Sequence, residues 1–174
     1  MKNMILLCVA VVLGACASTN VEYDYDEQAN FNNFKTYNYL PDIQSGLSQL
    51  DLNRMMKATD SIMQSRGYIK SETPDLLINV VADQYEDQSR NTVGIGLGSG
   101  GGNVGVGVSG GIPIGGRQLH QTLTVDLVDA NKDILIWQAV SDSNLKLRIN
   151  PEEREAYFFK IMEKIFSKFP PKSK

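Results

Sequence analysis

Two neighbouring segments in the second half of the chain have the pattern of a β-hairpin. In residues 119–127 one set of alternate side chains is mostly aliphatic, and the other set is mostly polar. Residues 129–132 have the composition of a turn, and residues 134–139 form a second apolar run. Alternation with a period of two places the two sets of side chains on opposite faces of a strand. The sequence therefore predicts an antiparallel sheet that contains this hairpin.

Three further segments are predicted to be strands. Residues 21–26 alternate between apolar and acidic side chains, and residues 35–40 form a second strand that Pro41 ends. Residues 76–82 are apolar on both faces, which is typical of a central strand. We expect this last strand to continue to Tyr85 before the sequence becomes polar.

Two segments have the helical spacing of apolar residues. Asp51 is the predicted N-cap of the first helix, and Gly67 supplies the left-handed residue that ends it. The second helix is predicted to begin with Asn150 as its N-cap and Pro151 in its first position, followed by two glutamates. The expected buried stripe of the second helix consists of Phe158, Ile161, Met162, Ile165 and Phe169.

The order of these elements predicts the fold class. It is strand, strand, helix, strand, glycine-rich hairpin, strand, strand, helix. Mostly antiparallel strands with two amphipathic helices favour an α+β fold, a two-layer sandwich with both helices on one face of the sheet. We expect residues 21–170 to form this single domain, with a glycine-rich insertion at residues 92–117.

The glycine-rich tract is patterned rather than random. Residues 94–116 hold twelve of the fifteen glycines of the chain. Aliphatic residues alternate with glycine in residues 93–97 and again in residues 104–108. Two short strands joined by a turn would place the aliphatic side chains on one face and leave bare backbone on the other.

Four interpretations of this tract differ in function. The simplest is a surface hairpin, and the second is a surface for self-association or for a partner. The third is a membrane-inserting hairpin, although these strands are shorter than the ~9–11 residues that cross a bilayer. The fourth is phosphate binding, because Gly105-x-Gly107-x-x-Gly110 matches the dinucleotide fingerprint. No helix is predicted after this motif, so we reject nucleotide binding.

The start of the chain has the organisation of a bacterial lipoprotein leader. Lys2 precedes an apolar run in residues 4–13, which is about half of the ~20 residues that a transmembrane helix needs. The run ends in Leu13-Gly14-Ala15-Cys16, which matches a lipobox. We therefore expect a signal peptide in residues 1–15, cleavage between Ala15 and Cys16, and lipid on Cys16.

The alternative is an ordinary cleaved signal in which Cys16 is incidental. Ala17 follows the cysteine where a signal for retention in the inner membrane usually has Asp. We therefore expect an outer-membrane lipoprotein that faces the periplasm, with residues 16–20 as the lipid-anchored tether.

Composition limits the classes of partner. Removing the leader removes one basic residue, Lys2, and leaves 16 basic against 20 acidic residues, a net charge of −4. A mildly acidic chain without a basic cluster is not expected to bind nucleic acid. Cys8 would leave with the leader and Cys16 would carry lipid, so no thiol would be left for a disulfide, a metal site or a nucleophile.

The sequence does not indicate catalysis. His120 is the single histidine, and a lone histidine on a strand face is usually structural. The acidic face of the first strand could hold a cation but is more simply a solvated face; its residues are Glu22, Asp24 and Asp26. A second group of acidic residues lies around the predicted hairpin turn, where the preference of turns for aspartate explains their presence. They are Asp126, Asp129 and Asp133. We assign no catalytic, cofactor-binding or metal-ligating residue.

Several short motifs, in their order along the chain, resemble the bacterial lipoproteins grouped as domain of unknown function 4136. They are Val21-x-x-Asp24-Tyr25-Asp26, Phe34-Lys35-Thr36-Tyr37, Arg66-Gly67-Tyr68, Pro74-Asp75-Leu76-Leu77-Ile78, and residues 122–129 followed by Ile136-Trp137. Tyr39 stands where that family often has Trp. The resemblance covers the mature chain and implies a lipid-anchored domain without an assigned activity, so it adds no site residues.

Two functions follow as expectations. The first is a non-catalytic lipoprotein of the outer membrane that binds an envelope protein or has a structural role. The second is an accessory subunit of a lipid-transport or secretion assembly, whose glycine-rich hairpin contacts membrane or self-associates. Neither requires a cofactor, a nucleotide or nucleic acid.

Replacing the lipidation residue tests the anchor. We expect wild-type protein to show a lipid mass increment on Cys16 and to fractionate with the outer membrane, whereas Cys16→Ser shows neither. Intact-mass spectrometry and membrane fractionation of the two proteins measure this. A wild-type protein that is soluble and lacks the increment would contradict the lipobox interpretation.

Overall fold

The computed structural model describes residues 19–87, 92–94, 111–113 and 118–172. The predicted signal peptide, its cleavage site at Ala15 and Cys16, and most of the glycine-rich tract lie outside the described residues.

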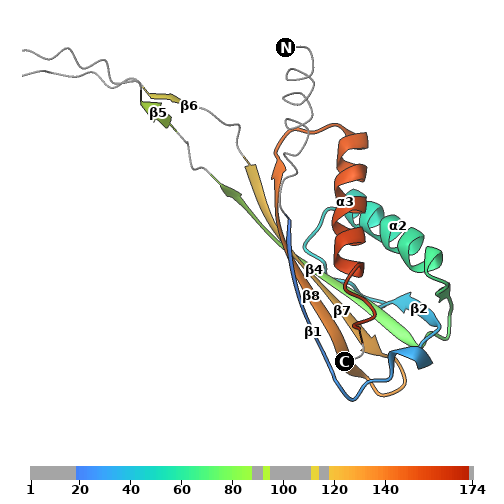
Figure 1. The fold of residues 1–174 in the computed structure, drawn as a ribbon. Coiled ribbons are helices and arrows are strands. Elements are labelled where there is room, and N and C mark those ends of the chain that lie inside the picture. The colour runs from blue at the N-terminus through green and yellow to red at the C-terminus, as the bar shows by residue number, and fades with distance from the viewer. Residues whose placement is uncertain (1–18, 88–91, 95–110, 114–117, 173–174) are drawn as a thin grey trace, which may run out of the picture.

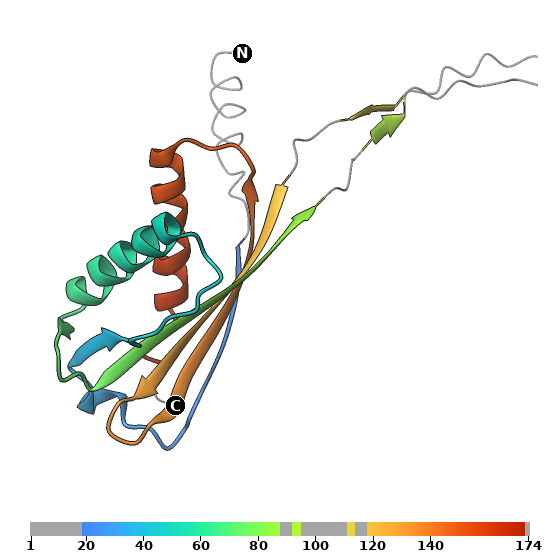
Figure 2. The same cartoon turned by 180° about the vertical axis from the view of Figure 1, so that it is seen from behind.

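A six-stranded sheet forms one layer and two helices form the other (Figure 1). In spatial order the strands are β1 (Asn20–Tyr25), β8 (Ile134–Lys146), β7 (Gln118–Asp129), β4 (Leu76–Asp87), β2 (Thr36–Tyr39) and β3 (Ile69–Lys70). Both helices, α2 (Gln49–Ser65) and α3 (Pro151–Phe166), cover the same face, and no described helix or strand covers the opposite one (Figure 2). The predicted α+β fold, mostly antiparallel with its helices on one face, is confirmed.

The predicted hairpin of β7 and β8 is the longest antiparallel pairing in the described sheet, together with that of β4 and β7. The side chains of Leu123, Val125 and Leu127 have no solvent exposure and face the helices. A register shift follows Leu127, which pairs with Trp137, whereas the next residue of β7 pairs with Leu135. The extra residue on β8 is a β-bulge, which lets two consecutive side chains of that strand be buried.

The prediction that residues 76–82 form a central strand is confirmed, because β4 lies inside the sheet with a paired strand on each edge. Leu76, Ile78 and Val80 are fully buried beneath the helices, but Val81 is 46% exposed on the other face. β4 lies inside the sheet, between β7 and β2, so its apolar sequence reflects neighbouring strands. It does not reflect a second covering layer among the described residues.

β2 pairs in parallel with both β4 and β3, unlike the other strands of this sheet, and α2 and β3 lie between β2 and β4 in the chain. The carboxylate of Asp75 joins them, because it accepts hydrogen bonds from the backbone N–H groups of Lys35 and Thr36 at 2.8 and 2.9 Å. These two bonds, above all that from Lys35, hold the pKa of Asp75 below its ordinary value.

A carboxylate of α2 also binds β2. The Asp60 carboxylate accepts hydrogen bonds from the hydroxyls of Tyr37 and Tyr39 at 3.0 and 2.8 Å, and Lys70 lies 3.0 Å away. Burial and the neighbouring Asp60 raise the pKa of Tyr37 to about 12. The tyrosines therefore remain neutral donors that fix α2 on the sheet.

The first helix begins earlier than predicted. Its N-cap is Ser48, whose hydroxyl accepts a hydrogen bond from the backbone N–H of Asp51, so Asp51 is the third helical residue rather than the cap. A serine followed three residues later by an acid satisfies the helix terminus more completely than Asp51 alone. Gly67 has a φ of +87°, as expected for the residue that ends the helix.

The second helix begins as predicted. Asn150 and Glu153 form a reciprocal capping box, with Pro151 at the first helical position. The helix ends at Phe166, before the predicted stripe ends, but Phe169 beyond it is still buried. The aromatic ring of Phe169 lies 5.4 Å from that of Trp137.

The two helices are joined by a buried ion pair. Asp51 of α2 is 4% exposed, and Arg154 of α3 donates to its two oxygens at 2.7 and 2.8 Å. Arg54 adds a third contact at 2.9 Å. At the other end of the helices, the guanidinium of Arg66 donates to the backbone carbonyls of Phe166 and Phe169.

Removing the cation of this pair should destabilise the domain. In Arg154→Ala, the Asp51 carboxylate stays buried with fewer donors, so we expect the free energy of unfolding to fall by about 2 kcal/mol. Chemical denaturation measures this change. The matched control is Glu155→Gln on the same helix, which removes the exposed ion pair with Lys57 and should leave stability unchanged. Equal effects of the two substitutions would contradict the prediction.

The same pair predicts a pH dependence. Burial opposes ionisation of Asp51, but hydrogen bonds from Arg154 and Ser48 outweigh it and lower its pKa below the ordinary 3.8. The stability that Asp51 contributes is therefore complete above pH ~5 and is lost as the pH falls through the lowered pKa. The stability difference between wild type and Asp51→Asn should shrink when unfolding is measured from pH 7 down to about pH 2. A constant difference would disprove this assignment.

Candidate binding surfaces

The glycine-rich tract enters the described structure only at its two ends. β5 (Thr92–Gly94) and β6 (Gly111–Pro113) pair antiparallel, with Val93 opposite Ile112. The ends of the tract are therefore paired, as a hairpin requires. The predicted strands in residues 93–97 and 104–108 otherwise lie outside the described residues.

No described helix or strand covers the sheet face opposite α2 and α3 (Figure 2), and we call it the open face. Tyr85 and Val81 of β4 are 57% and 46% exposed, and Leu135 of β8 is 50% exposed. Single exposed apolar residues are common, but these three lie on one face of the same sheet.

Polar side chains on the open face are fixed by cross-strand hydrogen bonds. Asp126 of β7 accepts from the amides of Asn79 at 3.2 Å and Gln138 at 2.8 Å, one from each neighbouring strand. Thr122 donates to Asp142 at 2.7 Å. The face therefore presents ordered polar groups between its apolar side chains.

The acidic residues near the start of the domain do not converge on one point. Glu22 and Asp24 lie in β1, where they pair with the open-face positions of β8. Asp26 lies after β1 and accepts a hydrogen bond from the backbone N–H of Gln28 at 2.8 Å. No metal-sized group of three His, Cys, Asp or Glu side chains occurs among the described residues.

The acidic group at the hairpin is also separated. Asp129 belongs to the turn and accepts hydrogen bonds from the backbone N–H groups of Asn131 and Lys132 at 3.0 and 3.2 Å. Asp133 has a φ of +55°, a conformation that turns accept. Asp126 instead lies within β7 on the open face, so turn chemistry does not account for it.

His120 lies at the same face, near the end of β7 that leads back to the glycine-rich tract. Its Nδ1 is 3.0 Å from the side-chain oxygen of Asn144, and its ring lies 4.7 Å from that of Tyr85. Its Nε2 is 3.8 Å from a carboxylate oxygen of Asp142. These contacts give His120 packing and hydrogen-bond partners, and its structural role stays a prediction.

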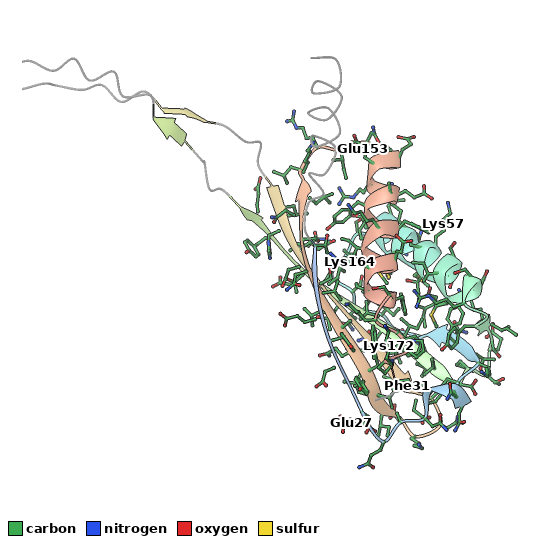
Figure 3. The ribbon with its side chains drawn as sticks, in the orientation of Figure 1. Glu27, Phe31, Lys57, Glu153, Lys164 and Lys172 are labelled. Carbon is green, nitrogen blue, oxygen red and sulfur yellow. The ribbon has the colours of Figure 1, made fainter. Side chains whose placement is uncertain are left out.

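A pocket of about 390 Å³ lies at one end of the sandwich, between the β1–β2 connection and the chain that follows α3. Figure 3 shows Glu27, Phe31 and Lys172 at this end, far from Glu153 at the start of α3. The rings of Tyr25 and Phe31, the latter in the short 3-10 helix η2 (Phe31–Asn33), meet edge to face at 6.0 Å. The sequence carries no local signal for this pocket, because its walls come from opposite ends of the chain.

Among the helices that the structure describes, none is both long and apolar enough to cross a membrane.

The sequence profile of the domain of unknown function 4136 (DUF4136) matches residues 21–171. The chain belongs to the DUF4136 family. The match covers both helices and all six strands of the main sheet except the first residue of β1, and it confirms the resemblance inferred from the short motifs. No curated protein matches this DUF4136 chain in sequence.

Solved structures share the fold at low sequence identity. A PDZ domain protein from Parabacteroides distasonis has a TM-score of 0.56 and 10% identity; the match covers 99% of the DUF4136 chain but only 41% of that protein. The PelC dodecamer from Paraburkholderia phytofirmans has a TM-score of 0.53 and 10% identity, covering 90% of this chain and 100% of that one. A dodecamer of a single-residue variant of the same PelC has a TM-score of 0.51 and 11% identity, covering 86% and 95%. At this identity the likeness establishes the fold alone.

Proposed function

We propose that this DUF4136 protein is a lipoprotein of the outer membrane that faces the periplasm and acts, without catalysis, as a binding or structural component of the envelope. The observation that carries the binding role is the open face. The described helices cover one face of the six-stranded sheet, so the second face is free to receive a partner.

The chemistry of the open face supports a protein partner. Val81, Tyr85 and Leu135 offer apolar contact, and the hydrogen-bonded Asp126 offers a fixed acceptor between them. Interfaces between proteins combine apolar and aromatic contacts with polar groups of this kind. The cross-strand bonds hold the polar side chains in place before binding, which lowers the entropy lost on association.

The proposed location rests on the lipobox that ends at Cys16. β1 begins at Asn20, four residues later. Four extended residues reach at most ~14 Å, so a lipid on Cys16 would hold the domain close to the membrane surface. The function proposed needs no cofactor, nucleotide or nucleic acid.

A second candidate is an accessory subunit of a lipid-transport or secretion assembly that associates with copies of itself. Two structures of similar fold are dodecamers. The sheet is not closed, and its outermost described strands, β1 and β3, each have one unpaired edge. In this alternative the open face or the glycine-rich hairpin contacts another copy or the membrane.

Photo-crosslinking from the open face distinguishes the two candidates. A photoreactive phenylalanine analogue at Val81 or Tyr85 should cross-link to a defined protein in intact cells, which mass spectrometry identifies. The matched control is the same analogue at Ser61, which is exposed on α2 in the helix layer. We expect strong cross-linking from the two sheet positions and little from Ser61.

The identity of the cross-linked protein decides the outcome. A different envelope protein supports the first candidate, and a second copy of this chain supports the alternative. Equal yields from Ser61 and the open face, or no cross-link at either sheet position in correctly anchored protein, would contradict a binding role for this face.

A further inference from the structure

A second concave site lies between the middle of α3, the end of β8 and the start of β1, and we call it the α3–β8 hollow. Its volume is about 590 Å³, within the range of small-molecule sites. All but one of its lining residues have a polar side chain; they are Thr19, Asn20, His120, Asp142, Ser143, Asn144, Lys146, Tyr157, Lys160 and Ile161. β1 pairs with β8 only as far as Asp142, so the last residues of β8 have no described strand on that side.

The floor of the hollow continues into buried polar groups. The Tyr157 hydroxyl lies 2.7 Å from Ser143 Oγ and donates to Gln121 Oε1 at 2.8 Å. Gln121 has no solvent exposure, and its Nε2 has no hydrogen-bond partner in the described structure. Directly opposite it on β4, the buried Nε2 of Gln84 also has none there.

A group of buried polar atoms such as those of Ser143, Gln121 and Gln84 is unusual between the helices and the sheet. A buried donor without an acceptor is unfavourable, and most of the described inner face is apolar. The hydroxyls and amides at the floor can bind water or a ligand rich in hydroxyl groups, beside the apolar surface that makes up most of the lining.

The rim of the hollow is cationic. Lys146 comes from β8 and Lys160 from α3, and both are exposed. Lys164 follows Lys160 by four residues, so the two lie along one side of α3, and Lys168 comes two residues after the helix ends. Lys164, labelled in Figure 3, donates to the backbone carbonyl of Thr19, and Lys168 lies 6.0 Å from the ring of Tyr23.

These lysines have no carboxylate partners: in the part of the chain that the structure covers, no acidic group is within ion-pair distance of any of the four. The acid in the lining, Asp142, accepts a hydrogen bond from Thr122 at 2.7 Å and lies 3.8 Å from His120. The cations of the rim are therefore available to an anion.

We propose that the α3–β8 hollow binds the phosphate ester of a polyol. Lys146 and Lys160 would pair with the phosphate, and the hydroxyls and amides of the lining would bind the polyol. This is the chemistry of an anionic phospholipid headgroup and also of a free sugar or glycerol phosphate. The hollow itself does not depend on the anchor, whereas a headgroup source rests on the proposed lipid at Cys16, three residues before Thr19.

Isothermal titration of the purified full-length protein in a neutral detergent tests the site. The probes are sn-glycerol 3-phosphate, dihexanoylphosphatidylglycerol and, as the zwitterionic control, dihexanoylphosphatidylcholine. We expect binding of the first two, weakened about tenfold in the double variant Lys146→Gln, Lys160→Gln. Tyr157→Phe removes the hydroxyl of the floor without changing the charge and should also weaken binding.

The matched control variant is Lys35→Gln. Lys35 is an exposed lysine beside Asp75 at the opposite end of the sheet, so this variant should bind the probes as wild type does.

Binding of glycerol phosphate but not phosphatidylglycerol would support a free polyol phosphate as the ligand. Binding of both would support a membrane headgroup. No binding, equal binding of phosphatidylcholine, or binding unchanged in the double lysine variant would overturn the proposal. The lipid mass increment on Cys16 tests the anchor separately. Failure of phosphate binding therefore does not imply failure of the lipoprotein proposal, or the reverse.

Discussion

The packing of aromatic rings between the last segment of the chain and the middle of the sheet supports the rest of this structure. Trp137 of β8 is nearly fully buried, and the rings of Phe166 and Phe169 lie 6.1 and 5.4 Å from it. Large aromatic side chains contribute more burial than any other type. Because the carbonyls of these two phenylalanines also accept hydrogen bonds from Arg66, the same contact fixes both helices on one face.

The helices cover one face of the sheet, and the described part of the other face is in contact with water. This difference explains why the side chains of the two faces differ in polarity. The inner face is aliphatic at Ile78, Val80 and Leu127, where the helices lie over it. The outer face combines hydrogen-bonded acids and amides with a few exposed apolar side chains. Polar groups occur on the inner face beside the first half of α3, at Gln121 and Ser143, and there a hollow opens to solvent. The lining of this hollow also includes His120 and Asp142 of the open face, so the two proposed binding surfaces adjoin at the end of β8.

Local sequence signals predicted most elements but not their partners. The alternation in residues 119–127 identified β7 because one of its faces is buried. The capping box at Asn150 was predictable because its contacts lie within four residues. Asp51 was misassigned as a cap because Ser48, three residues earlier, is also a capping residue, whereas the ion pair of Asp51 with Arg154, 103 residues away, has no local signal. The central position of β4 was predicted, but the exposure of Val81 was not, because an apolar sequence does not distinguish a strand with neighbours on both edges from one with layers on both faces.

The sequence by itself determined the features that depend on contiguous residues: the lipobox as a prediction, the α+β order of elements, the helix starts to within a turn and the motifs of the DUF4136 family. Only the tertiary structure decided which strands pair in parallel, which face stays open and where Lys146, Lys160 and Tyr157 meet. The reason is physical. Capping and alternation are set by neighbours in the chain, whereas pockets and ion pairs form from side chains that the fold alone brings together.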